Sequence, residues 1–163
     1  MWGGFDKAVN NAIEALANQK KELLETIGDI LVSSTVQRFR DGKGPDGATW
    51  EPSGRAWEQG LAVQAREATK KRKAIRGRKE TGKFGKTLVD TGLLRNSITH
   101  AVALDGVYVG SNLKYARIHQ MGGKTGKGHS VTMPARPYLG ISEEDKKEVQ
   151  EAIQDFLSQA FKG

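Results

Sequence analysis

Apolar residues recur at three- and four-residue steps through the first part of the chain. The members of this stripe are Val9, Ile13, Leu16, Leu23, Ile27 and Ile30, with Leu24 and Leu31 widening it. Such spacing predicts one long amphipathic helix over residues 5–40. Asp6 is its expected N-cap, and Gly42 follows the last periodic residue, Phe39. Because the opposite face carries charges of both signs, we interpret the stripe as the face that packs against the protein core.

Alternation of apolar and polar positions replaces the helical spacing in residues 88–141, where most of the strong turn signals also lie. Strand-like patterns cover residues 97–104 and 106–110. Between them, Asp105-Gly106 is typical of a two-residue hairpin turn. We therefore expect residues 88–141 to form the β-rich core of the domain.

Two short helical segments are expected within this β-rich core. Asp90 or Thr91 can cap the first, which carries the apolar residues of positions 93–98. The second covers residues 115–121 and ends at the glycine pair that starts with Gly122.

The last part of the chain predicts a loop, a short strand and a helix. Residues 124–128, rich in Lys and Gly, predict a mobile loop, and residues 130–133 predict a short strand. Residues 142–161 predict a closing amphipathic helix, with Ser142 as its N-cap and acidic residues in its first turn. Together these elements predict an α+β fold, in which a small antiparallel β-sheet is packed by the long N-terminal helix and the shorter C-terminal helix.

The composition is that of a globular protein. The chain has 163 residues, which suits a single domain with one modest core, and 37% of them are hydrophobic. The apolar runs are too short for a transmembrane helix, and the first residues lack the basic start and apolar block of a secretory signal. The chain has no cysteine, so neither disulfides nor thiolate metal sites contribute.

The positive charge is concentrated in one basic arm, residues 66–87. The arm holds ten Lys or Arg and two acidic residues, a local charge of +8 that accounts for the whole excess of +7. Such a run is either a solvated arm or a contact surface for a polyanion such as DNA. Because no aromatic residue precedes Phe84 in the arm, any such contact should be independent of sequence. The candidates for contact with a polyanion are Lys70, Lys71, Arg72, Lys73, Arg76, Arg78 and Lys79.

Few residues suggest catalysis. Asp90-Thr91-Gly92 matches the short motif of aspartic proteases, in which two such aspartates share a proton, and a dimer could supply the second copy. However, Leu93 and Leu94 stand where those enzymes have small or polar residues. The three histidines are not spaced as metal ligands, and two partial matches to phosphate-binding loops do not follow a buried strand. The residues favour a structural or binding protein without a catalytic site, metal or cofactor. A dimeric aspartic protease is kept as the third interpretation, after the two that are given below.

A series of short motifs follows from Phe39 to the closing helix. They are Phe39-Arg40-Asp41-Gly42, Pro45-Asp46-Gly47, Trp50-Glu51-Pro52, the run from Leu88 to Ile98, Val109-Gly110-Ser111-Asn112, Tyr115-Ala116, the run from Ile118 to Gly123, and the run from Pro134 to Gly140. In this order they resemble the virion morphogenesis, or tail completion, proteins of Mu-like tailed phages.

The resemblance implies a non-enzymatic protein of the virion neck, assembled in the bacterial host cytoplasm. It implies a ring, of six copies, at the head-proximal end of the tail, which enables a finished tail to join a DNA-filled head. The implied partners are further copies of the chain, tail terminator or tail tube proteins and head–tail connector proteins, with no membrane. A channel containing genomic DNA would give the basic arm a partner. The main alternative is a basic, sequence-nonspecific nucleic-acid-binding module.

The motif residues are expected to maintain the fold rather than to carry chemistry. These candidates are Asp90, Gly92, Gly110, Tyr115, His119, Gly122, Arg136 and Leu139. The glycines stand where turns are expected. Arg136 lies between two prolines and is a candidate for an ion pair within or between subunits.

The charge of the basic arm predicts salt-dependent binding to duplex DNA. Binding should weaken steeply as the salt concentration rises, because lysine and arginine contacts release counterions from the phosphates. Replacing Lys70, Lys71, Arg72 and Lys73 by glutamine should flatten the dependence of log K on log salt, measured by fluorescence anisotropy. Binding that is insensitive to salt, or that strongly prefers one DNA sequence, would contradict this prediction.

Overall fold

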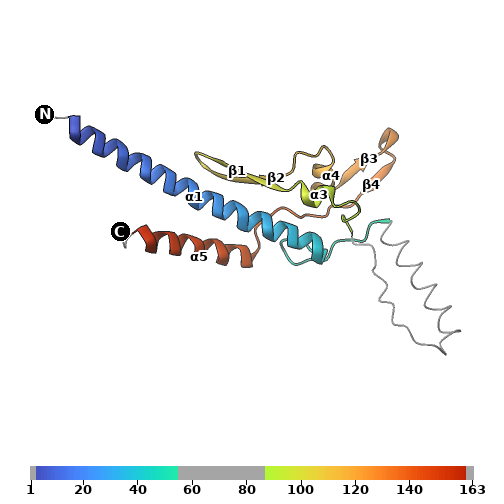
Figure 1. Ribbon diagram of the computed structural model, residues 1–163. Helices are drawn as coiled ribbons and strands as arrows, with labels where there is room; N and C mark the ends of the chain where they lie inside the picture. The colour runs from blue at the N-terminus through green and yellow to red at the C-terminus, as the bar shows by residue number, and fades with distance from the viewer. Residues whose placement is uncertain (1–2, 55–86, 161–163) are drawn as a thin grey trace, which may run out of the picture.

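The computed structural model describes residues 3–54 and 87–160. Figure 1 shows a long helix, α1, with two small β-hairpins on one side and a shorter helix, α5, on the other. This arrangement confirms the predicted α+β fold, with a long N-terminal and a shorter C-terminal helix. In chain order the elements are α1 (Gly3–Asp41), α3 (Leu93–Asn96), β1 (Thr99–Ala103), β2 (Gly106–Gly110), α4 (Ala116–Met121), β3 (Gly123–Thr125), the 3₁₀ turn η1 (Lys127–His129), β4 (Val131–Met133) and α5 (Glu143–Ala160).

Helix α1 confirms the predicted long helix, which at 39 residues is about 58 Å long. It begins at Gly3, so Asp6 lies inside the first turn, and its prediction as the N-cap was wrong. The helix ends as predicted before Gly42, which has a φ of 68° and donates its N–H to the carbonyl oxygen of Arg38 at 2.8 Å. Within the described ranges, no helix is both long and apolar enough to cross a membrane.

The first hairpin pairs β1 with β2 in antiparallel register, with Thr99 opposite Gly110 and Ala103 opposite Gly106. The turn residues are therefore Leu104 and Asp105, one position earlier than the predicted Asp105-Gly106 turn. The hydroxyl of Tyr108 donates to the Asp105 carboxylate at 2.7 Å, which ties the turn to the second strand.

The second hairpin was not expected. Strand β3 pairs with β4, with Lys124 opposite Thr132, so the prediction of a mobile loop over residues 124–128 was wrong. Strands of three residues are too short to show a clear alternation of apolar and polar side chains, which explains why β3 had no signal. The two hairpins form two separate two-stranded sheets, rather than the single small sheet expected.

The core lies where the C-terminal half of α1 meets the loop that follows it. The ring of Phe39 is fully buried and packs edge-on against Trp50, with 5.6 Å between ring centroids. It also packs, tilted by 42°, against Tyr138, with 5.0 Å between centroids. The indole N–H of Trp50 donates to the carbonyl oxygen of Pro137 at 2.8 Å. Trp50 therefore anchors the loop after α1 to the body of the domain.

His100 fastens the first hairpin to α1 at Gly28. Its Nε2 lies 2.9 Å from Oε2 of Glu25, and its Nδ1 lies 3.6 Å from Oδ1 of Asp29. The imidazole ring crosses the helix so closely that a Cβ added to Gly28 would lie 2.4 Å from its Cδ2 atom. A glycine, which is unfavourable inside a helix, is needed here because the hairpin approaches the helix backbone.

The apolar stripe of α1, predicted as the core-packing face, is covered only in part. Ile13 and Leu16 are 59% and 66% exposed, and the stripe residues from Leu23 to Leu31 are only partly buried. The hairpin contacts α1 at Gly28, whereas Thr26 faces α5. Successive helical residues are about 100° apart, so these two contacts lie on nearly opposite sides of the helix. The stripe runs between them, along a side that neither neighbour fully covers.

Gly28→Ala should destabilise the protein even though alanine is the better helix former. The new methyl group would force the His100 ring away from α1, and we expect a net loss of roughly 1–2 kcal/mol in the free energy of unfolding. Urea unfolding followed by circular dichroism measures the change. Gly106→Ala is the control, since a Cβ there meets no atom within 4 Å. Greater stability of Gly28→Ala would show that His100 moves aside freely.

Candidate functional site

One extended segment holds the parts of the domain together. Residues 134–140, which we call the linking segment, have no regular secondary structure but their backbone is extensively bonded. The side-chain amide of Gln120 in α4 accepts the N–H groups of Tyr138 and Leu139 at 2.9 and 3.0 Å, and donates to the carbonyl oxygen of Leu139 at 3.0 Å. A single glutamine thus satisfies backbone groups that a neighbouring strand would otherwise satisfy.

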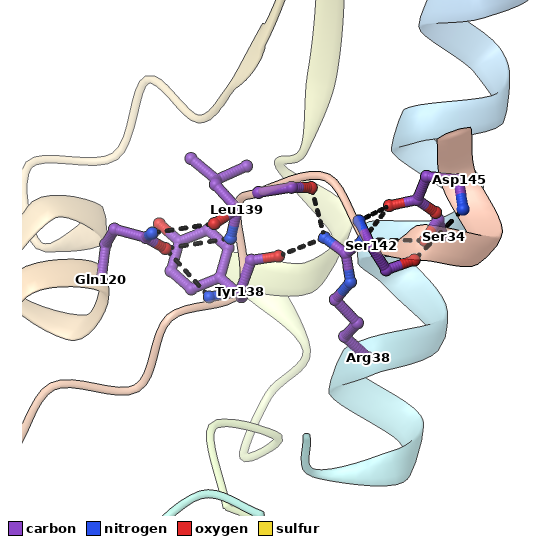
Figure 2. A network of polar contacts seen from close by, with 8 residues as sticks. Ser34, Arg38, Gln120, Tyr138, Leu139, Ser142 and Asp145 are labelled. Atoms are coloured by element: carbon purple, nitrogen blue, oxygen red, sulfur yellow. Dashed lines mark hydrogen bonds and ion pairs between the residues drawn. The ribbon is translucent and has the colours of Figure 1, made fainter. Parts of the chain in front are cut away.

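Arg38 joins the linking segment to both long helices (Figure 2). From α1, its Nη1 donates to the carbonyl oxygens of Tyr138 at 3.0 Å and Gly140 at 2.8 Å. Its Nη2 donates to Ser34 Oγ at 3.1 Å and forms an ion pair with Asp145 of α5. Arg38 and Asp145 are only 7% and 2% exposed. A buried charge requires this degree of pairing, because each ion has lost its hydration.

Asp145 also caps the helix that carries it. Its Oδ2 accepts the N–H of Ser142 at 2.7 Å, and its own N–H donates to Ser142 Oγ at 3.2 Å. Ser142 is therefore the N-cap that the sequence predicted, in a reciprocal capping arrangement. Burial raises the pKa of Asp145, but the hydrogen bonds from Ser142 and Ser34 and the charge of Arg38 outweigh burial, so the net pKa is lowered.

A pocket of about 470 Å³ lies beside the start of the linking segment. Residues near Ser53 and Leu88 line it, together with α3, α4, β4 and the start of the linking segment. Five of the eight predicted motif residues meet in its wall, although they come from three separate parts of the chain. They are Asp90, Gly92, Tyr115, His119 and Arg136.

His119 places a partly buried imidazole ring in the pocket wall. Its ring packs edge-on against Tyr115 with 5.9 Å between ring centroids, and its carbonyl oxygen accepts the N–H of Arg136 at 2.8 Å. Its Nδ1 is buried and has no hydrogen-bond partner among the described residues. Desolvation by burial, helped by the positive charge of Arg136, lowers the pKa of His119, so the ring is neutral at pH 7.

Arg136 binds backbone carbonyls rather than a carboxylate in the described part of the chain. Its Nε donates to the carbonyl oxygen of Glu51 at 2.7 Å, and its Nη2 donates to that of Pro52 at 3.3 Å. The ion pair expected for Arg136 is therefore not observed within these ranges. Burial lowers the pKa of Arg136, and the nearby charge of Glu51 opposes this shift.

The remaining motif residues occupy structural positions. The N-cap of α3 is Gly92, with a φ of 78°, so the prediction of Asp90 or Thr91 as the cap was wrong. The Thr91 hydroxyl nevertheless accepts the N–H of Leu93, the first residue of α3, at 3.3 Å. Gly122 ends α4 with a φ of 68°, and a Cβ there would lie 2.6 Å from the backbone nitrogen of Ala135. Gly110 ends β2, has no positive φ, and would accept a Cβ without meeting any atom within 4 Å. Leu139 packs against the hydrophobic core.

Comparison with known proteins decides the family. The model of the phage virion morphogenesis family matches residues 2–158. The chain belongs to this family. Mu-like prophage FluMu G protein 2 of Haemophilus influenzae is 39% identical over 157 residues, covering 94% of this chain and 92% of that protein. Putative capsid assembly protein G of Escherichia phage Mu is 31% identical over 135 residues, covering 81% and 76%. No solved structure matches the chain.

The family match includes the basic arm, but the arm lies outside the described residues. Its polyanion-contact candidates therefore stay predictions from the sequence. In the described ranges, no cluster of three or more His, Cys, Asp or Glu side chains is arranged to hold a metal ion.

Arg38, Gln120 and Asp145 were not among the predicted site residues, although their side chains bind the linking segment and the start of α5. Arg38 and Asp145 are 107 positions apart, and no local pattern links them. The spacing of Ser142 and Asp145 resembles a capping box and could have indicated their reciprocal hydrogen bonds. Gln120 has no local signal, because its role depends on a segment 18 residues later.

Asp145→Asn tests the buried ion pair of this virion morphogenesis protein. The amide can still cap α5 but leaves the Arg38 charge unpaired, so we expect a loss of about 3–5 kcal/mol in the free energy of unfolding at pH 7. Because the folded-state pKa of Asp145 is lowered, the carboxylate stabilises the wild type above its unfolded pKa of about 4, and this stabilisation is lost below that pH. The difference between wild type and variant should therefore shrink on acidification.

Chemical denaturation at several pH values measures both effects. Glu143→Gln is the matched control, because Glu143 pairs with Lys146 on the surface, where its side chain is 77% exposed. This control should change stability little. An Asp145→Asn variant as stable as the control at pH 7 would show that the ion pair is dispensable.

Proposed function

We propose that this protein is a structural, non-enzymatic component of the phage neck that enables a finished tail to join a filled head. The observation that carries the proposal is membership of the virion morphogenesis family over nearly the whole chain. One relative, from phage Mu, is named putative capsid assembly protein G. A role in assembly requires surfaces for other proteins, and the fold offers several.

The shape of the domain supports an assembly role. The N-terminal end of α1 extends beyond both the hairpin and α5 (Figure 1), and the described side chains of α1 from Asn11 to Glu22 are all exposed. A helix end that the described part of the chain leaves uncovered is stabilised mainly by packing against another surface. We therefore propose that the helix is completed by contacts in the assembled particle.

The proposed assembly is a closed ring at the head-proximal end of the tail, with six copies to match the rotational symmetry of a tubular tail. Its neighbours would be the tail terminator or tail tube proteins on one side and head–tail connector proteins on the other. A ring places two different patches of each subunit in contact. The channel would contain genomic DNA, and the basic arm of +8 would face its phosphates.

Deletion of this chain from its phage tests the proposal directly. We expect filled heads and full-length tails that accumulate without joining, visible by electron microscopy of the lysate. Adding the purified protein should restore joining and infectivity, because the missing component acts after both structures are complete. Glu143→Gln protein is a suitable positive control, since its exposed side chain is not part of a proposed contact.

Other outcomes would assign the protein elsewhere. Infectious particles that form without it, or tails that stop before full length, would contradict a role in joining. Complete, joined particles that lack packaged DNA would favour the alternative, a basic module that binds nucleic acid without sequence preference. A proteolytic activity that is abolished by Asp90→Asn would support the third hypothesis, an aspartic protease.

A further inference from the structure

The pocket beside the start of the linking segment has exposed apolar side chains in its wall. Leu93 begins α3, Tyr115 precedes α4 and Val131 begins β4, and these residues are 61%, 41% and 52% exposed. Three separate parts of the chain thus bring apolar surface to one concavity. Such a cluster is typical of a binding site, and the pocket volume of about 470 Å³ suits a small ligand or a short peptide segment.

Arg136 adds an almost completely buried charge to the same wall. The residue is only 4% exposed, and its guanidinium stays charged at any physiological pH. The carbonyl oxygens of Glu51 and Pro52 accept its Nε and Nη2, but neutral oxygens do not cancel the charge. Its Nη1 donates to no atom of residues 3–54 or 87–160, and no carboxylate in these ranges forms an ion pair with it.

Two acidic residues near the pocket do not compensate this charge. The carboxylate of Glu51 attracts the guanidinium, but burial outweighs the attraction, so the pKa of Arg136 is lowered. Asp90 also lines the pocket, but it is exposed, and its charge is not among those that act on Arg136. A buried charge without an ionic partner is costly, so the wall favours an anion from outside this part of the chain.

The imidazole of His119 senses the same uncompensated charge. Burial is the main cause of its lowered pKa, and the positive charge of Arg136 lowers it further. The pocket therefore combines a positive potential with an apolar surface. A phosphate group has no apolar part to cover Leu93 and Val131, whereas a protein segment can supply a carboxylate and apolar side chains together.

We propose that the pocket binds a segment of a neighbouring virion protein, in which an aspartate or glutamate pairs with Arg136 between apolar side chains. The unbonded Nη1 of Arg136 donates to the carboxylate, in a charge-assisted hydrogen bond. The flanking apolar side chains cover Leu93 and Val131 and exclude water, which strengthens the ion pair. The location of the partner in the virion rests on the proposed function, whereas the chemistry of the pocket does not.

Two matched peptides test the chemistry of the site in the full-length protein. Acetyl-Leu-Glu-Leu-amide supplies one carboxylate between apolar side chains, and acetyl-Leu-Gln-Leu-amide has nearly the same shape without the charge. We expect the Glu peptide to bind at least about fivefold more tightly, measured by NMR titration. High salt during the titration screens the exposed charges of the basic arm. Equal affinities of the two peptides would overturn the proposal.

The ring protons of His119 give a readout that is specific to the pocket. A carboxylate beside Arg136 opposes the positive charge that acts on the imidazole, so saturation with the Glu peptide should raise the pKa of His119. The Gln peptide should not raise it. His100 and His129 do not line the pocket and serve as internal controls. An unchanged pKa of His119, or equal changes at all three histidines, would overturn the proposed site.

Dimethyl phosphate distinguishes a protein partner from a nucleic-acid partner. This anion has the charge of a DNA phosphate without the apolar side chains of the peptide. We expect it to change the pKa of His119 far less than the Glu peptide does at the same concentration. An equal change would assign the pocket to nucleic acid and overturn the proposal of a protein segment.

Leu93→Glu tests the site with little risk to the fold, because Leu93 is 61% exposed. Arg136→Gln is less suitable, because it also removes hydrogen bonds to the loop after α1. The new carboxylate repels the ligand and competes for Arg136, so we expect Leu93→Glu to weaken binding of the Glu peptide at least about tenfold. The matched control is Leu104→Glu at the hairpin tip, 95% exposed and outside the pocket wall. It should stay within about twofold of the wild type.

Sedimentation equilibrium distinguishes a neighbouring protein from a second copy of this chain. If the wild type self-associates and Leu93→Glu abolishes this association while Leu104→Glu does not, the pocket binds a second copy and the proposal is wrong. Association that is the same in all three proteins agrees with a different virion protein as the partner.

The pocket and the proposed function can fail separately. If the peptides bind as expected but phages lacking the chain still join heads to tails, the site holds and the proposed function is wrong. If the deletion blocks joining and Leu93→Glu protein restores it as fully as Leu104→Glu protein, the function holds and the proposed partner of the pocket is wrong.

Discussion

The buried guanidinium of Arg38 is the interaction on which the rest of the structure depends. It lies where α1, the linking segment and α5 meet, and it is 7% exposed. Its charge is balanced by Asp145, and its other N–H groups are bound by Ser34 and by two carbonyl oxygens of the linking segment. Such a group tolerates few alternatives, because any lost partner leaves a charge or a polar atom buried without compensation.

This constraint sets the position of α5 and of the surfaces around it. Asp145 serves both the ion pair and the cap of α5, so the start of the helix cannot move without breaking both. The opposite side of α1 is held by His100 through its close approach to Gly28. With neighbours on two nearly opposite sides, α1 exposes the side between them. The partial exposure of the apolar stripe of α1 is thus a consequence of how the domain is held together.

The motif of the linking segment acts through its backbone more than through its side chains. Pro137, Tyr138, Leu139 and Gly140 all contribute carbonyl oxygens to hydrogen bonds from side chains elsewhere in the fold. Arg136 is the exception, since its side chain supports the loop after α1 by donating to two backbone carbonyl oxygens. The linking segment therefore holds the domain together, while the surfaces proposed for assembly lie on α1 and in the pocket.

Local patterns in the sequence determined the helices, the first hairpin and the family. The long helix ends where Gly42 allows a positive φ, α5 begins at the predicted Ser142, and the hairpin differs from expectation by one position. These features depend on residues close together in the chain, so periodicity and capping rules capture them. The convergence of motif residues around one pocket depended instead on how separate segments pack.

Only the tertiary structure decided the contacts between distant residues and the exposure of the helix. Arg38 forms an ion pair with Asp145, which lies 107 positions later in the chain. The side chain of Gln120 forms the backbone hydrogen bonds of the linking segment that a neighbouring strand would otherwise form, although the sequence of this segment has no strand pattern. The periodicity of the sequence showed which side of α1 is apolar. It did not show whether other helices or strands of the described chain pack over that side. Whether a buried charge finds its partner, and whether an apolar helix side is covered by another element, depend on the whole fold. They therefore cannot be read from any short stretch of sequence.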